Sequence, residues 1–298
     1  MARKLAALLL LLAPAAFAQQ DLSAVQIKVT PVAGAVYMLE GAGGNIGVSV
    51  GDDGIVIIDD QYAPLAPKIK AALASISSAP VRFVVNTHYH GDHTGGNEAF
   101  GESAPIVAHE NVRKRLAAGL DAPGMKIPPA PAGALPVVTF NDRVTIHLNG
   151  EDLRALHVPH AHTDGDSVIF FPKSNVVHMG DLFFNGRFPF VDIDGGGSVR
   201  GVIDGVEAVL PKIPAGAKII AGHGPLGTAA ELKAYADALR AMMAAVEAGL
   251  NAGKTAAQLK EEKVLDKWSS WSWNFIPADR FIDILVRDIQ GRTVPAKG

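Results

Sequence analysis

A run of four potential metal ligands, placed directly after an apolar segment, constrains this chain more than any other feature. The apolar segment ends at Val85, and the ligands stand within six residues: His88, His90, Asp92 and His93. Side chains two residues apart in an extended chain point to the same side, so His88 and His90 can hold one ion. Gly91 lets the chain turn, and Asp92 and His93 are then poorly placed to reach that ion. The spacing therefore predicts two metal ions side by side.

The donor atoms indicate which metal the loop takes. Imidazole nitrogens with one carboxylate oxygen and no thiolate suit zinc, although iron and manganese use similar sites. The alternative is a polar loop whose histidines only cap or hydrogen-bond, but neutral histidines are rarely packed this densely without a common partner. The chain has no cysteine, which excludes both thiolate ligands and disulfides.

The His-x-His-x-Asp-His run of residues 88–93 resembles the signature of the metallo-β-lactamase superfamily. Three further motifs follow in the order which that family uses: Ala161-His162-Thr163-Asp164-Gly165-Asp166, Met179-Gly180-Asp181 and Gly222-His223-Gly224-Pro225. The resemblance covers residues 45 to 225 and is specific for the superfamily. It does not fix the substrate.

The resemblance implies a complete ligand set. His88, His90 and His162 would hold one zinc ion, Asp92, His93 and His223 would hold the second, and Asp181 would bridge the two. A bridging water with its pKa lowered to about 7 would then attack the substrate as metal-bound hydroxide, with no serine or cysteine nucleophile. The resemblance implies that Asp92 and Asp181 are the carboxylates of this catalytic centre.

Two further residues near the motifs leave alternatives open. Asp59 closes a predicted strand, and the resemblance implies that it supports the metal loop from behind; a plain strand-end carboxylate is the alternative. His160 stands two residues before His162 and competes with it as a ligand. The Thr-x-Gly-Asp context that follows favours His162.

The first half of the chain alternates strands and helices. Short β-branched runs at 36–39, 46–50 and 55–59 predict an antiparallel meander, with a hairpin turn at 51–54. Apolar residues with helical spacing over 65–76 and a strand at 81–86 then form a crossover unit. The carboxyl end of such a strand is where open α/β sheets place ligand sites, and the histidine loop falls there.

A second half, which begins at about the strands 139–149 and 153–158, repeats the strand-helix-strand order after the following segments. A strand at 105–108 and a helix at 110–118 precede residues 122–136, where five prolines and two glycines predict a rigid, irregular excursion. Strands are predicted at 139–149, 153–158, 167–171, 175–180 and 218–221, with a hairpin turn at Asn149-Gly150 and a helix over 199–210. The resemblance implies an α/β fold, the four-layer αββα sandwich, with the site at the seam between the sheets.

The C-terminal part reads as helical. Thr228 and Thr255 each open a predicted helix as a capping box, and a last amphipathic helix covers 281–289. Trp268, Trp271 and Trp273 lie in the loop before that helix. They either wall the pocket or pack in the core.

Charge limits the partners. A net charge of −3 without long basic runs argues against nucleic acid, so a small molecule is the expected substrate. Two zinc ions, two carboxylates and a hydroxide leave roughly +1 in the pocket, which favours an anionic substrate. Arg187 is a candidate anchor for its carboxylate; a surface salt bridge is the alternative.

The N-terminus predicts export. Arg3 and Lys4 precede an apolar run over residues 5–16, and Ala16-Phe17-Ala18 forms a small-x-small cleavage site. Residues 1–18 are thus a predicted signal peptide and residues 19–298 the hydrolase domain. The run is shorter than the ~18 apolar residues of a membrane span, so no anchor is expected after cleavage. The predicted location is the periplasm of a bacterium or the medium.

Branches of the superfamily remain to be separated. The missing cysteine leaves only the all-histidine group of β-lactamases compatible, whereas a bridging aspartate such as Asp181 is more typical of glyoxalase II-like thioesterases and lactonases. Export favours a β-lactam. The sequence predicts a secreted dinuclear zinc hydrolase of a cyclic amide or ester, with a β-lactam first and a lactone or (thio)ester second. A periplasmic zinc-binding protein without turnover is the non-enzymatic alternative.

Overall fold

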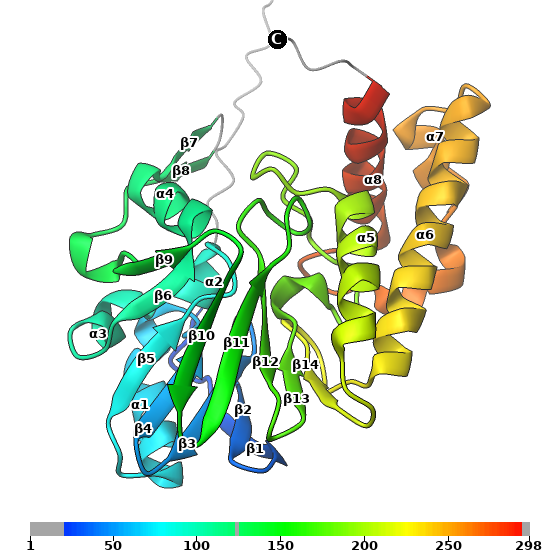
Figure 1. Ribbon diagram of the computed structural model, residues 1–298. Coiled ribbons are helices and arrows are strands. Elements are labelled where there is room, and N and C mark those ends of the chain that lie inside the picture. Colours follow the sequence, from blue (N-terminus) through cyan, green and yellow to red (C-terminus); the bar gives the residue numbers. More distant parts are fainter. Residues whose placement is uncertain (1–20, 123–124, 294–298) are drawn as a thin grey trace, which may run out of the picture.

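The computed structural model describes residues 21–122 and 125–293, so the predicted signal peptide lies outside the described residues. Two sheets pack face to face, with helices on both outer faces (Figure 1). The predicted four-layer αββα sandwich is confirmed.

The first sheet contains seven strands in the order β1-β2-β3-β4-β5-β6-β9. Pairing is antiparallel from β1 to β4 and parallel from β4 to β9, with helix α1 in the crossover between β4 and β5. The strands are β1 (Lys28–Ala33), β2 (Val36–Glu40), β3 (Ile46–Gly51), β4 (Gly54–Ile58), β5 (Val81–Val85), β6 (Ile106–His109) and β9 (Val138–Phe140).

The second sheet contains five strands in chain order. Pairing is antiparallel up to β13, and β13 pairs in parallel with β14 after helix α5. The strands are β10 (Arg143–Leu148), β11 (Glu151–His157), β12 (Ser167–Phe171), β13 (Val176–His178) and β14 (Lys218–Ile220).

The helices lie outside the sheets (Figure 1). As predicted, Thr228 and Thr255 cap the two helices that follow them, because each hydroxyl accepts from a backbone N–H three residues on. None of the described helices is long and apolar enough to cross a membrane. The α-helices are α1 (Ala66–Ile76), α2 (Gly91–Thr94), α3 (Asn97–Gly101), α4 (Glu110–Ala118), α5 (Val199–Val209), α6 (Ala229–Asn251), α7 (Ala256–Glu261) and α8 (Ala278–Thr293). The 3-10 turns are η1 (Ala63–Leu65), η2 (Ala132–Ala134), η3 (Gly180–Leu182), η4 (Leu210–Lys212) and η5 (Asp266–Trp271).

Three apolar layers hold these elements together, because successive side chains of a buried strand point to opposite faces. In β4, Ile55 and Ile57 pack toward α1, whereas Val56 and Ile58 pack between the two sheets. Side chains of the second sheet alternate in the same way, and those on its outer face pack against α5, α6 and α8. The sheets are therefore buried on both faces, which explains their long apolar runs.

Some sequence predictions need correction. The strand predicted over 139–149 is two strands, because the chain leaves the first sheet after β9 and opens the second sheet with β10. Residues 122–136 are not wholly irregular: β7 (Leu120–Ala122) pairs with β8 (Met125–Ile127), and η2 follows. No proline interrupts residues 125–127, so their N–H groups stay available for pairing.

The first strand and the last helix also differ from the prediction. The edge strand β1 was not predicted; it contains Pro31, which an edge strand tolerates. The last helix begins at Ala278, three residues earlier than predicted.

Candidate metal centre

The ligand loop is the direct continuation of β5. Asn86 and Asn97 hold its two ends together through paired side-chain hydrogen bonds of 3.0 Å. His90 precedes the short helix α2, and its backbone carbonyl accepts from the His93 and Thr94 N–H groups; the helix carries Asp92 and His93 and turns them back toward His88. The strand end thus presents all four predicted ligands at one edge of the sheet.

The structure brings His88, His90 and His162 together as a first group of three donors. The Nε2 atoms of His88 and His162 lie 3.1 and 2.9 Å from His90 Nδ1. His162 comes from the loop between β11 and β12, so this triad joins the two sheets.

A second group consists of Asp92, His93 and His223. His223 Nε2 lies 3.3 Å from Asp92 Oδ2 and 3.5 Å from His93 Nε2. His223 follows β14 in a segment where it forms a parallel bridge with Phe184. Asp92 is the open side of this group, since 22% of its side chain is exposed whereas His93 is fully buried.

Asp181 lies between the triads. Its carboxylate is 3.1 Å from His93 and 3.4 Å from both His162 and His223. The Oδ1 atom is buried and makes no hydrogen bond in the described part of the chain, although it is close to His93. A buried carboxylate oxygen without a partner is costly, and a cation beside it removes that cost.

Hydrogen bonds on the far side of each imidazole fix the tautomers of the first triad. His162 Nδ1 lies 2.8 Å from the Phe190 carbonyl, which can only accept, so neutral His162 presents a lone pair at Nε2. His90 Nε2 lies 2.9 Å from the carboxylate of Asp192, so His90 presents a lone pair at Nδ1. These two lone pairs face each other across 2.9 Å, an arrangement that a cation between them stabilises.

His88 follows the same pattern. The Thr87 hydroxyl donates to Asp59 and therefore accepts from His88 Nδ1, 3.0 Å away, which leaves Nε2 of His88 as a third lone pair in the cluster. The donors and tautomers of the first triad fit a metal ion, and the donor types of the second triad fit another.

Asp59 supports the loop as the resemblance implied. It is fully buried with φ +64, and its carboxylate lies 2.7 Å from Thr87 N, Thr87 Oγ1 and His93 Nδ1. A non-glycine residue holds positive φ only where its surroundings enforce it. Asp59 thus orients a ligand of the second triad.

Burial and charge divide the histidines into two classes. Burial lowers the pKa of His162 to about 4, and burial together with His93 lowers the pKa of His88 well below its usual range. Burial acts in the same direction at His223, but the carboxylates of Asp181 and Asp92 outweigh it and raise the pKa to about 9; they raise the pKa of His93 in the same way. His88 and His162 are therefore neutral at pH 7, while the second triad carries protons that a metal would displace.

Several residues of the site were not predicted from the sequence. Asp192, which also accepts from the Tyr89 hydroxyl, is 102 residues from His90 and carries no motif. Gly44 and Gly222 approach the cluster so closely that a Cβ would lie 2.1 Å from the His93 ring or 2.0 Å from Asp181 Oδ1. Only the absence of a side chain permits these contacts.

The remaining predicted residues lie around the cluster. His160 is exposed and belongs to no group of metal-ligating residues in the described chain. Trp271 stacks on Tyr235 in the core, whereas Trp273 lies 5.7 Å from His223. Trp268 packs against the same core.

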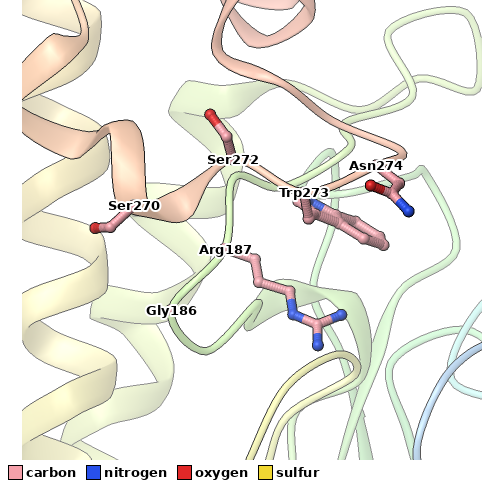
Figure 2. A pocket seen from close by; sticks show the side chains of 6 residues that line it. All are labelled: Gly186, Arg187, Ser270, Ser272, Trp273 and Asn274. Carbon is pink, nitrogen blue, oxygen red and sulfur yellow. The ribbon is translucent and has the colours of Figure 1, made fainter.

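Arg187 lies beside the centre with its guanidinium 5.2 Å above the Trp273 ring, and no carboxylate of the described residues pairs with it. Both residues line an open pocket of about 460 Å³, which Figure 2 shows together with the other lining residues Gly186, Ser270, Ser272 and Asn274. Arg187 therefore forms no salt bridge among the described residues, in contrast to the salt-bridge alternative.

The sequence profile of the metallo-beta-lactamase superfamily matches residues 31–245. The chain is 27% identical over 141 residues to the 2,4-dinitroanisole O-demethylase subunit alpha of Nocardioides sp. (strain JS1661), covering 46% of this chain and 40% of that protein. It is 28% identical over 167 residues to the cytoplasmic hydroxyacylglutathione hydrolase of Arabidopsis thaliana, covering 54% of this chain and 56% of that protein. The matches thus span about half the length of these relatives.

Solved structures agree in fold. A metallo-beta-lactamase from Pontibacter korlensis superposes with a TM-score of 0.59 at 20% identity, over 72% of this chain and 99% of that chain. The stereoselective inverting sec-alkylsulfatase Pisa1 from Pseudomonas sp. superposes with a TM-score of 0.62 at 18% identity, over 88% of this chain and 50% of that chain. With the profile match over most of its length, this chain belongs to the metallo-beta-lactamase superfamily, whose members are generally metal-dependent hydrolases.

Proposed function

We propose that the protein is a dinuclear zinc hydrolase that cleaves an ester-type bond, a lactone or a thioester, in a small molecule. The observation that carries the proposal is the position of Asp181, whose carboxylate contacts histidines of both triads. Seven converging donors are too many for one tetrahedral ion, which supports two ions per chain.

The donor atoms support zinc, because they are nitrogen and oxygen without sulfur. Zinc ions held there would polarise the substrate carbonyl and make water a nucleophile at neutral pH. Among the protein's own groups, Asp92 would hold the second ion from its open side. In the metal-free protein, burial acts to raise the pKa of Asp92, but the positive charges of His93 and His223 outweigh burial and lower the pKa to about 2, so the carboxylate is ionised and available as a ligand.

The order of substrates differs from the one that the sequence alone favoured. A carboxylate between the two ion sites is more typical of thioesterases and lactonases in the superfamily than of β-lactamases. The likeness to a hydroxyacylglutathione hydrolase supports the same class. We therefore place the ester-type bond before the β-lactam.

A hydrolysis panel tests the proposal. Zinc-loaded protein is assayed with an acyl-homoserine lactone, a thioester, a cephalosporin and a carbapenem, before and after removal of metal with a chelator. We expect turnover of the lactone or the thioester that disappears with the chelator and returns with zinc. Metal analysis showing one ion or none at saturating zinc, or no turnover of any compound, would contradict the proposal.

Two substitutions of Asp181 separate the branches. Asp181→Asn and Asp181→Ser should each reduce ester hydrolysis by at least about a hundredfold, the scale on which metal sites respond to loss of a ligand or its partner. A β-lactam activity that survives in Asp181→Ser would instead assign the protein to the lactamase branch, because all-histidine lactamases need no carboxylate there.

We also propose export, supported by the sequence of residues 1–18. Expression in a bacterium with fractionation and mass spectrometry should recover a periplasmic or secreted protein that begins at Gln19. A cytoplasmic protein that retains Met1 would rule export out.

A further inference from the structure

A row of aromatic side chains runs along the metal centre from one triad to the other. Trp273 lies 5.7 Å from His223, Phe275 follows at 5.6 Å, and Phe190 at a further 5.7 Å. Phe190 in turn lies 5.6 Å from His90. We call Phe190, Trp273 and Phe275 the aromatic arc; its two ends contact ligands of the two triads.

Hydrogen bonds hold the arc in place. The Trp273 indole N–H donates to the Phe188 carbonyl at 2.9 Å, and Phe188 N–H donates to Trp271 O at 2.9 Å. Asn185 N–H donates to His223 O at 2.9 Å, which ties the same loop to the second triad. The arc is therefore preorganised beside the metal centre.

Two guanidinium groups stack on the arc. Arg187 lies 5.2 Å above Trp273, and Arg280 lies 4.3 Å above Phe275 and 5.7 Å from Phe190. Arg280 also donates to the Phe275 carbonyl at 2.7 Å. Within residues 21–122 and 125–293, neither guanidinium pairs with a carboxylate, so the arc carries two positive charges that are not neutralised.

Most of the arc follows the part of the chain that the superfamily profile matches. The superfamily profile ends at residue 245, whereas Trp273, Phe275 and Arg280 follow it. Phe275 remains 45% exposed, although large aromatic side chains are usually covered. An exposed ring beside two arginines that pair with no carboxylate of the described residues, next to the open pocket lined by Arg187 and Trp273, indicates a surface suited to a ligand.

We propose that the aromatic arc with Arg187 and Arg280 binds the substrate and selects an anion with an aromatic or other planar apolar body. The body lies on Trp273 and Phe275, and Arg187 binds the carboxylate through paired N–H donors. The proposal rests on the proposed hydrolase function for its substrate, but the binding face itself can be tested without turnover.

The test uses zinc-loaded protein and two probes of the same shape, 4-nitrobenzoate and the neutral 4-nitrobenzamide. Quenching of tryptophan fluorescence reports binding, and Trp273→Phe shows how much of the signal comes from this indole. We expect the anion to bind more tightly than the amide, and Arg187→Met to weaken the anion about tenfold or more while leaving the amide unchanged. Arg82→Met is the matched control, because Arg82 is an exposed arginine at the opposite end of β5.

Turnover gives the second readout. Two aryl esters that differ only in a free or an amidated carboxylate should show a preference for the anion, and Arg187→Met should abolish this preference through KM with kcat retained. If neither Arg187→Met nor Arg280→Met changes binding of the anion or hydrolysis of the ester, the inference is overturned while the hydrolase function stands. Arginine-dependent binding of the anion by a protein without hydrolysis would retain the arc and refute the function.

Discussion

At the scale of single residues, His160 and His162 show how two neighbouring histidines take different roles. His162 is fully buried with Nε2 2.9 Å from His90, whereas His160 is exposed with φ +52. We predict that His162→Ala loses about one of two zinc ions and most activity, while His160→Ala retains both ions. Metal analysis after dialysis measures this directly; equal zinc loss in the two variants would show that the ligand is misassigned.

Protonation offers a second prediction at this scale. Because the pKa of His223 is raised to about 9 and that of His93 is also raised, both are protonated at pH 7 in the metal-free protein. Metal binding needs neutral imidazoles, so zinc at the second triad should release about two protons at pH 7, and zinc at the first triad should release fewer. Affinity of the second triad should therefore fall as the pH drops from 9 toward 6. Calorimetry in buffers of different ionisation enthalpy counts the protons, and equal release from both triads would contradict the assignment.

Four of the seven ligands were visible in the sequence because a short loop after a strand places them by local geometry, whereas His162, Asp181 and His223 followed only from the resemblance to the superfamily. The groups that orient these ligands were not visible in the sequence. Asp192 reaches His90 only through the folding of the second half, and Phe190 contacts two ligands without any pattern that marks it. Contacts between residues far apart in the chain need the tertiary structure.

At the scale of elements, close packing around the ligand loop leaves no room for a larger side chain at neighbouring glycines. Gly44 lies before β3, and a Cβ there would stand 2.1 Å from the His93 ring. We predict that Gly44→Ala displaces His93, weakens the second zinc by at least about tenfold and destabilises the fold by about 1–3 kcal/mol. Gly133→Ala is the matched control, because a methyl group added there would have no neighbour within 4 Å. Zinc competition assays and urea unfolding compare the variants, and wild-type behaviour of Gly44→Ala would refute the packing argument.

Element boundaries were predictable where turn residues mark them. Asn149 and Gly150 both have positive φ and join β10 to β11 as the sequence indicated. The change of sheet between β9 and β10 was not predictable, because the same extended conformation continues on both sides of residues 141–142. Which sheet a strand joins depends on its partners rather than on its own residues.

At the scale of the whole molecule, the metal centre joins the two halves. Four of the seven donors follow β5 of the first sheet, and His162, Asp181 and His223 follow strands of the second. Ions that bind only the folded protein stabilise it by about 2.7 kcal/mol each at a hundredfold excess over Kd. We predict that zinc raises Tm by about 10 °C over chelator-treated protein.

A variant checks that this stabilisation comes from the centre. His162→Ala, which removes a donor of the second half, should gain only about half of the zinc-dependent rise. Scanning calorimetry with zinc and with chelator gives both values. An unchanged Tm in the wild type would mean that the halves are held together without the ions.

The segment that carries Trp273, Phe275 and Arg280 lies beyond the part of the chain that matches the superfamily profile, while all seven donors lie within it. Three of the five residues proposed to bind the substrate are thus separate in sequence from the metal donors, while Arg187 and Phe190 stand among them. If the arc binds the substrate as proposed, substitutions at Trp273, Phe275 or Arg280 should change substrate preference and leave the zinc content unchanged.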